Sequence, residues 1–250
     1  MLCGYRIRIQ LILGLALLCV SMAHAEKVNV AVAANFTAPM KQIARKFASD
    51  TGHKAIISYG STGKLYAQII NGAPFDVFLS ADQARPHLLH KNALADPPIT
   101  YAIGRLALWS PDRKLVDKQG EVLRQNGFRR LAIANPRTAP YGLGAMQVIK
   151  HLGVGESLSH RLVRGENIAQ TFQFVMTGNA ELGFIALSQV KDDSDGSIWV
   201  PPQSLYDPIL QDAVLLARGR DNPAASSLIA FLGSDAARRI IANYGYSLAP

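Results

Sequence analysis

Four short polar turns in this sequence place hydrogen-bond donors at the start of amphipathic segments. Asn35, Ser61, Thr62 and Tyr141 supply side-chain donors in or beside them. The first N–H groups of a helix have no partner within it and carry a partial positive charge, so such turns can bind anions. The pattern predicts capture of a small oxyanion. The turns are Ala34-Asn35-Phe36-Thr37, Gly60-Ser61-Thr62-Gly63, Ala139-Pro140-Tyr141-Gly142 and Glu166-Asn167-Ile168-Ala169.

An anion held in this way needs no lysine or arginine beside it. Several neutral donors can hold a dianion, because converging backbone and side-chain dipoles supply the electric field. Any one of the four turns, taken alone, is explained as an ordinary helix N-cap. Four of them on a repeated scaffold favour a binding site.

Catalytic and metal-binding interpretations need residues that the sequence does not place nearby. The segment 60–64 is not a P-loop, because Ser58 stands where that motif requires Gly and Leu65 where it requires Ser or Thr. A secreted hydrolase using Ser61 or Asp76 is an alternative, but no histidine is placed beside either residue. The histidines also form no H-x-x-x-H or H-E-x-x-H pattern, so no metal site is predicted.

Strands alternate with helices along the chain, and this rhythm runs twice. The alternation predicts two α/β lobes of parallel sheet, with small-ligand sites at the carboxyl ends of the strands. The expected strands cover residues 28–32, 54–59, 75–79, 102–109, 131–134, 161–165, 182–187 and 209–217, and the expected helices cover 40–48, 64–70, 141–152, 168–177, 224–232 and 236–244.

Residues 1–25 have the three parts of a secretory signal. Arg6 and Arg8 form a positive start, Ile9 to Val20 is an apolar run, and Ala23-His24-Ala25 fits the cleavage pattern. Cleavage after Ala25 would release a soluble exported protein that starts at Glu26. An uncleaved anchor is the alternative.

Composition excludes several further classes of function. Cys3 and Cys19 both lie in the predicted signal, so the mature chain would have no disulfide, no thiolate metal site and no cysteine nucleophile. The formal net charge of the whole chain is +8, which helps to attract anions. Its Lys and Arg residues are scattered without a basic-aromatic run, so no nucleic-acid partner is predicted.

The turns, in this order, resemble those of the periplasmic molybdate-binding proteins of molybdenum ABC importers. The resemblance spans essentially the whole mature chain, from Val30 to Tyr246. AANFT, NGAPFDVFLSAD and APYGLG are its most specific segments. The matching motifs are VAVAANFT, YGSTGKLYAQIINGAPFDVFLSADQ, TYAIGRLALWS, ANPRTAPYGLGAMQVIKHLG, ELGFIALSQ and NYGY.

This resemblance implies a type II periplasmic-binding-protein fold of two lobes joined by two crossover strands. The expected lobe I comprises residues 26–105 plus 214–250, and lobe II comprises residues 106–213. The implied function is high-affinity capture of molybdate and tungstate in the periplasm and delivery to an ABC permease. It implies no catalysis and no cofactor, and we expect a monomer. A receptor for another tetrahedral oxyanion, such as sulfate, is the main alternative.

The resemblance also assigns the binding residues. The residues expected to contact the oxyanion are Asn35 with the backbone of Ala34, the hydroxyl of Thr62 with the adjacent Ser61, Tyr141, and the backbone N–H of Ile168. Some family members have serine at the position of Asn35, and some contact the ligand with a tyrosine at the position of Ala186. Alanine cannot donate a hydrogen bond from its side chain, so we expect Tyr141 to supply the phenolic donor here.

Overall fold

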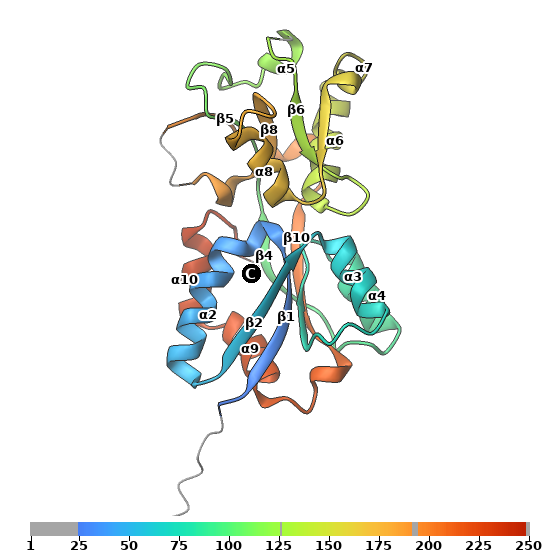
Figure 1. The fold of residues 1–250 in the computed structure, drawn as a ribbon, viewed down its shortest axis with the longest axis vertical. Helices are drawn as coiled ribbons and strands as arrows, with labels where there is room; N and C mark the ends of the chain where they lie inside the picture. The colour runs from blue at the N-terminus through green and yellow to red at the C-terminus, as the bar shows by residue number, and fades with distance from the viewer. Residues whose placement is uncertain (1–24, 126, 192–194, 249–250) are drawn as a thin grey trace, which may run out of the picture.

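Two α/β lobes, one above the other in Figure 1, make up the computed structural model. The structure describes residues 25–125, 127–191 and 195–248. The predicted signal, apart from Ala25, lies outside these residues. Each lobe is built on one five-stranded sheet. Among the described residues, no helix has the length and apolar character needed to span a membrane.

The first sheet has the strand order β2-β1-β3-β10-β4. Its parallel part pairs β1 with β2 and β3, and the last residues of the β1–β2 ladder are Ala33 and Gly60. β10 runs antiparallel to β3 and β4. The strands are β1 (Lys27–Ala33), β2 (Lys54–Gly60), β3 (Val77–Leu79), β4 (Ile99–Gly104) and β10 (Ile209–Leu215).

The second sheet has the strand order β7-β6-β8-β5-β9. β6 is parallel to β7 and β8, whereas β5 is antiparallel to β8 and β9. Both sheets thus combine a parallel part with an antiparallel strand in the interior. The strands are β5 (Leu106–Ser110), β6 (Leu131–Ala134), β7 (Leu162–Gly165), β8 (Leu182–Ala186) and β9 (Ser197–Trp199).

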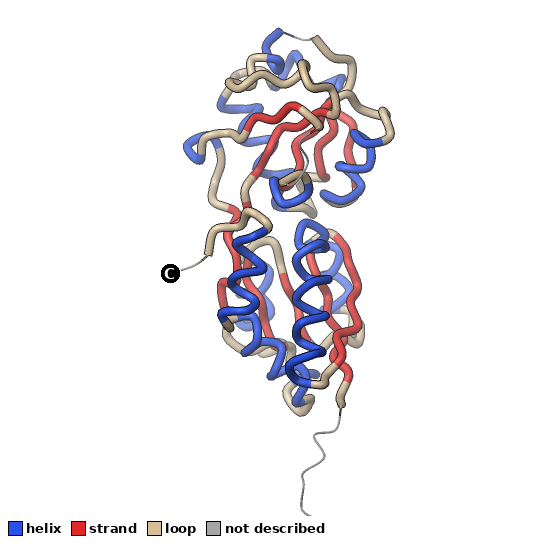
Figure 2. Tube along the Cα trace, turned by 90° about the vertical axis from the view of Figure 1, so that its left-hand side faces the viewer, coloured by secondary structure: helices blue, strands red, loops and turns tan. Residues whose placement is uncertain are grey.

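Helices cover the faces of each sheet, as Figure 2 shows with strands in red and helices in blue. α2, α9 and α10 pack with the first sheet around one apolar core, and α3 and α4 close a second, smaller one. In the other lobe α6 and the start of α8 pack in one core with the second sheet, and the rest of α8 packs in another. The helices are α2 (Thr37–Thr51), α3 (Thr62–Ile70), α4 (Ala84–Lys91), α5 (Val122–Gln125), α6 (Pro140–His151), α7 (Gly155–Leu158), α8 (Ile168–Met176), α9 (Pro223–Leu232) and α10 (Asp235–Asn243).

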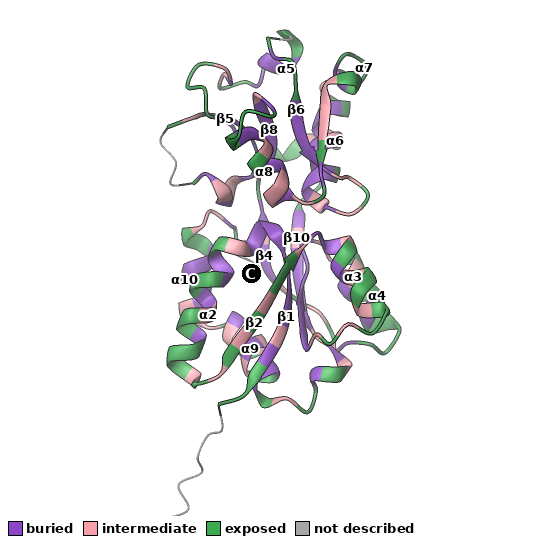
Figure 3. Cartoon of the chain, in the orientation of Figure 1, coloured by how far each residue is buried: buried purple, intermediate pink, exposed green. Residues whose placement is uncertain are grey.

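Sequence signals mark the ends of several helices. Asn222 and Ser234 cap α9 and α10 by accepting hydrogen bonds from the first-turn N–H groups of Ala224 and Ala237. α2 ends at Gly52, which adopts φ 76° in the left-handed region that glycine tolerates. The strands between the helices are mostly buried, and the outward helix faces are exposed (Figure 3). Local capping and apolar patterning therefore agree with the observed fold.

The chain passes between the lobes at two strand junctions. Only Arg105 separates β4 in the first sheet from β5 in the second, and residues 200–208 lead from β9 back to β10. These two crossovers agree with the predicted two-lobe architecture. The lobe boundaries themselves remain a prediction, and the one expected between residues 213 and 214 falls inside β10, which pairs wholly with the first sheet.

Several local expectations differ from the structure. The strand predicted over 102–109 is two strands, β4 and β5, because the chain leaves one sheet for the other at Arg105. α4 forms where no helix or strand was expected, and Pro86 is tolerated in its first turn, where no intrahelical N–H donor is needed. The short strand β9 and the short helices α5 and α7 were not predicted either.

Gly142, in the first turn of α6, allows this helix to approach β6 closely. An added Cβ would lie 2.2 Å from the carbonyl oxygen of Ala134, which is inside van der Waals contact. Gly142→Ala is expected to lower the free energy of unfolding by about 1–3 kcal/mol, the usual cost of overpacking. Urea denaturation measures this. Gly155→Ala is the matched control, because its Cβ would meet only Ile149 Cγ2 at 3.8 Å. Equal stability of the two variants would contradict the packing argument.

Candidate functional site

All six residues predicted to bind the anion line one cavity between the lobes. About 10 Å³ of the cavity is open to the centre of a water-sized sphere. The first lobe contributes the turns that follow β1, β2 and β3, and the second contributes the turns that open α6 and α8. The lining residues are Ala33, Ala34, Asn35, Gly60, Ser61, Thr62, Ala81, Ala139, Pro140, Tyr141, Asn167 and Ile168.

The cavity lining is uncharged, and polar side chains interrupt its apolar surface. Among the described residues, none that lines it is a Lys, Arg, His, Asp or Glu. The described part of the chain also contains no group of three or more His, Cys, Asp or Glu residues that could hold a metal ion. The donors are instead hydroxyl groups and backbone N–H groups at helix starts, whose dipoles favour negative charge.

Ser61 is the N-cap residue of α3, yet its side chain makes no capping hydrogen bond. The residue is 3% exposed, and its Oγ is buried without a hydrogen-bond partner. A buried hydroxyl without a partner is costly, so it indicates a ligand at this position. Thr62, beside it, accepts a hydrogen bond from the N–H of Ala81 at 3.0 Å, which fixes its side chain in the cavity wall.

Three helices begin at the cavity and present their first backbone N–H groups there. Thr62 opens α3, Tyr141 follows Pro140 in the first turn of α6, and Ile168 opens α8. An N–H in the first turn has no intrahelical acceptor, so these groups are available to a ligand. Asn167, the N-cap of α8, uses its side-chain oxygen to accept from Gln170 N at 3.0 Å, which orders this turn.

Asn35 lies at the cavity, but its amide is engaged within the protein. Its Nδ2 donates to Gln211 Oε1 at 2.9 Å and to Tyr246 Oη at 3.1 Å, which uses both N–H groups. The side-chain N–H groups of Asn35, which were expected to donate to the anion, therefore already donate to groups of the protein. Asn35 and Ala34 belong to the short 3-10 helix η1 (Ala34–Phe36), so the backbone N–H groups of this turn remain as donors.

The hydroxyl of Tyr141 also belongs to a polar network behind the cavity. It accepts from Gln211 Nε2 at 3.3 Å, and it lies so close to Gly104 that an added Cβ there would be 2.2 Å from it. Gln211 Oε1 in turn accepts from Tyr101 Oη at 3.0 Å. The network therefore joins Tyr141 of the second lobe to β4 and β10 of the first.

Three buried tyrosines in this network stay neutral. Burial raises the pKa of Tyr246 to about 12, although its hydrogen bonds with Ser188, Asn35 and Tyr141 act in the opposite direction. The pKa values of Tyr141 and Tyr101 lie well above the usual value near 10. Burial is the larger cause, and the neighbouring Tyr246 is the next. Each phenol therefore remains a hydrogen-bond donor at any ordinary pH.

The lobes touch at the rim of the cavity through direct polar contacts. Gly63 N donates to the carbonyl oxygen of Thr138 at 2.8 Å, and Lys64 forms an ion pair with Glu166. A Cβ on Gly63 would lie 3.0 Å from Thr138 Cα, so glycine permits this approach. Because each contact joins residues of opposite lobes, the two walls of the cavity are held together at these points.

Sequence analysis missed the polar residues behind the cavity. Gln211 is fully buried, and it interrupts the otherwise apolar start of β10 together with Asp212. Two polar residues within an otherwise apolar strand are a sequence signal for a buried hydrogen-bond network. Ser188 and Tyr246 lie within segments that carried the resemblance, but their roles depend on contacts between distant parts of the chain. Ala186 does not line the cavity.

An uncharged cavity between two α/β lobes is typical of a protein that binds a small solute. The chain belongs to the bacterial extracellular solute-binding protein family, whose model matches residues 28–247. This match supports the predicted fold class independently of the coordinates.

Two relatives are similar to this chain over nearly its full length. Molybdate-binding protein ModA of Azotobacter vinelandii is 54% identical over 246 residues, which cover 96% of this chain and 97% of that protein. Molybdate-binding protein ModA of Rhodobacter capsulatus is 47% identical over 238 residues, covering 94% and 92%. The family resemblance inferred from the sequence motifs is thus confirmed.

Solved structures agree with this assignment. The periplasmic molybdate-binding protein of Azotobacter vinelandii has a TM-score of 0.86 and 42% identity, covering 89% of this chain and all of that chain. The predicted two-lobe fold class is confirmed. The sulfate-binding protein SubI of Mycobacterium tuberculosis has a TM-score of 0.77 at 12% identity, covering 90% and 88%, which indicates the shared fold alone.

The raised tyrosine pKa values predict how stability depends on pH. An unfolded tyrosine titrates near pH 10, whereas Tyr246 in the fold titrates at about 12. The stabilisation from its neutral phenol is fully present below about pH 10 and is lost as pH rises through about 12. Phenolate absorbance should reveal a late-titrating group of tyrosines in the folded protein only. Titration of every tyrosine near pH 10 in the folded protein would contradict the buried network.

Proposed function

We propose that this protein captures molybdate, and also tungstate, in the periplasm and delivers it to the membrane permease of an ABC importer. The observation that carries the proposal is the buried, unpartnered Ser61 hydroxyl in an uncharged cavity at helix N-termini. The similarity to two proteins named molybdate-binding protein supports the choice of ligand. The protein acts as a binding protein, with no catalytic step and no cofactor.

The proposed contacts combine one hydroxyl with backbone donors from both lobes. Ser61 Oγ and the N–H groups of Thr62 and η1 hold the anion from the first lobe. The N–H groups of Tyr141 and Ile168 hold it from the second. Asn35 and Tyr141 therefore act through their backbone, while their side chains brace the site from behind. Hydrogen bonds to a charged acceptor are roughly twice as strong as neutral ones, which offsets dehydration of the anion.

Two alternative functions have less support, a sulfate receptor because the similar proteins are named molybdate-binding proteins, and a hydrolase because the described lining residues offer no base. A sulfate receptor would use the same kind of cavity, and a sulfate-binding protein has the same fold, so the fold alone does not select the anion. A hydrolase would need a base next to Ser61. Among the described residues, the cavity lining offers no His, Asp or Glu for that role.

The remaining features complete the proposal. The signal is cleaved after Ala25, so the mature protein starts at Glu26. The mature protein works as a monomer. Residues 26–105 and 214–250 belong to one lobe and residues 106–208 to the other. Residues 209–213, which were first expected in the second lobe, belong with the first, because β10 pairs with β3 and β4. Closure of the lobes around the anion then presents a single shape to the permease.

Thermal denaturation of the mature protein with a panel of anions tests the function. A ligand that binds only the native state raises the melting temperature by mass action. We expect molybdate and tungstate to raise it strongly, in keeping with a roughly micromolar to nanomolar Kd. Sulfate, phosphate and chromate should raise it much less. An equal or larger shift with sulfate would contradict the proposed ligand.

Ser61→Ala should separate binding from stability. Loss of one hydrogen bond to a charged ligand is worth about 1.5–3 kcal/mol, so calorimetry should show a roughly 10- to 150-fold weaker molybdate affinity. Without ligand the variant should be at least as stable as wild type, because this hydroxyl has no partner to lose.

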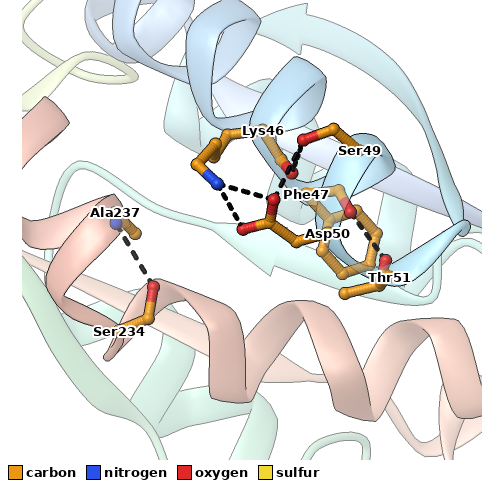
Figure 4. A network of polar contacts seen from close by, with 7 residues as sticks. All are labelled: Lys46, Phe47, Ser49, Asp50, Thr51, Ser234 and Ala237. Atoms are coloured by element: carbon orange, nitrogen blue, oxygen red, sulfur yellow. Dashed lines mark hydrogen bonds and ion pairs between the residues drawn. The ribbon is translucent and has the colours of Figure 1, made fainter.

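The matched control is Ser49→Ala. Ser49 lies on the exposed flank of α2, drawn in Figure 4, where its Oγ donates to the carbonyl oxygen of Lys46 at 2.9 Å. The Ser49→Ala variant should bind molybdate with the same affinity as the wild type. If Ser61→Ala also binds with unchanged affinity, the anion is not held at Ser61.

A further inference from the structure

The short 3-10 helix η3 (Leu187–Gln189), which follows β8, contacts two of the ligand turns from behind. Ser188 Oγ lies 3.3 Å from the carbonyl oxygen of Asn35 and can donate to it. Gln189 Nε2 donates to the carbonyl oxygen of Ile168 at 3.2 Å. Asn35 belongs to the first lobe and Ile168 to the second. Two consecutive residues thus connect the turns that face each other across the cavity.

Tyr246 closes this arrangement from the C-terminal segment of the first lobe. Its hydroxyl donates to the carbonyl oxygen of Asn35 at 2.7 Å and lies 3.0 Å from Ser188 Oγ. It also accepts from Asn35 Nδ2 at 3.1 Å. Tyr246 is 5% exposed and Ser188 is 9% exposed, so water competes little for these bonds. Asn35 is therefore fixed at both its backbone and its side chain.

The direction of these bonds matters for the ligand. In a helical turn the N–H groups point toward the helix start and the carbonyl groups point the opposite way. Donors placed on the carbonyls of Asn35 and Ile168 therefore hold the N–H side of each turn toward the cavity. Hydrogen bonds in a chain also polarise one another, which strengthens the donors that face the anion.

We infer that Ser188, Gln189 and Tyr246 are positioning residues that set the spacing between the Asn35 and Ile168 turns. This inference rests on the proposed function. A cage of fixed neutral donors selects between anions of equal charge through its radius. The three residues do not line the cavity. They therefore act on the size of the accepted oxyanion through the spacing of the two turns and not by contact with it.

Tyr246→Phe, Ser188→Ala and Gln189→Ala test the inference. Tyr246→Phe keeps the edge-on ring contact with Phe36, whose centroid lies 5.4 Å away, and removes only the hydroxyl. Calorimetry measures the molybdate affinity of each variant, and competition measures how much sulfate displaces bound molybdate. We expect about 10-fold weaker molybdate binding, the effect of losing one or two buried hydrogen bonds, and a smaller loss for sulfate. The molybdate-to-sulfate preference should therefore fall.

Tyr244→Phe is the matched control, since Tyr244 lies two residues from Tyr246 and is half-buried at the C-terminal end of α10. It should leave both affinities unchanged. If Tyr246 had a purely structural role, Tyr246→Phe would lower the affinities for molybdate and for sulfate by the same factor. If all three variants keep the wild-type preference, or exclude sulfate as completely as wild type, the inference is overturned.

The same titrations separate this inference from the proposed function. Wild-type protein that binds sulfate in preference to molybdate would contradict the proposed ligand. The positioning role would still be judged by whether Tyr246→Phe and Ser188→Ala change the ratio of the two affinities, while Tyr244→Phe leaves it unchanged.

Discussion

Enclosing an anion in a buried cavity without a counter-charge is the physical constraint on which this structure depends. Removing an ion from water carries a large free-energy cost unless every exposed lone pair finds a donor. The cavity lining carries no charged residue, so the donors must converge from several directions. Helix N-termini at the carboxyl ends of parallel strands provide such donors. Two lobes are needed because one sheet edge presents them from a single side.

The polar network behind the cavity follows from the same constraint. Backbone donors hold an anion well only if they are fixed before it arrives, because reorganisation would reduce the affinity. Gln211 bonds to Tyr101, Tyr141 and Asn35, and Asn35 bonds to Tyr246, so these residues form a buried set of hydrogen bonds that spans both lobes. Burial keeps these phenols neutral, so the network adds no negative charge that would repel the ligand.

Much of the fold, and the cavity that forms the candidate site, could be predicted from local sequence. The turns around Asn35, Ser61, Tyr141 and Ile168 combine apolar periodicity with helix-start residues, and all four line the cavity. The direction of the Asn35 amide could not be predicted, because its partners Gln211 and Tyr246 are distant in sequence. The division of one apolar strand at Arg105 was missed for a related reason. Gly104 and Arg105 interrupt the apolar run, but only the pairing of the strands shows that the chain changes sheet there.

Crystallography of the mature protein with molybdate, using the anomalous signal of molybdenum, tests the central claim most directly. The account predicts one strong peak between the lobes, with oxyanion oxygens at hydrogen-bond distance from Ser61 Oγ and from the backbone N–H groups of Thr62, Tyr141 and Ile168. It also predicts that no lysine or arginine contacts the anion. A peak outside this cavity, or an anion held by a charged side chain, would contradict the account.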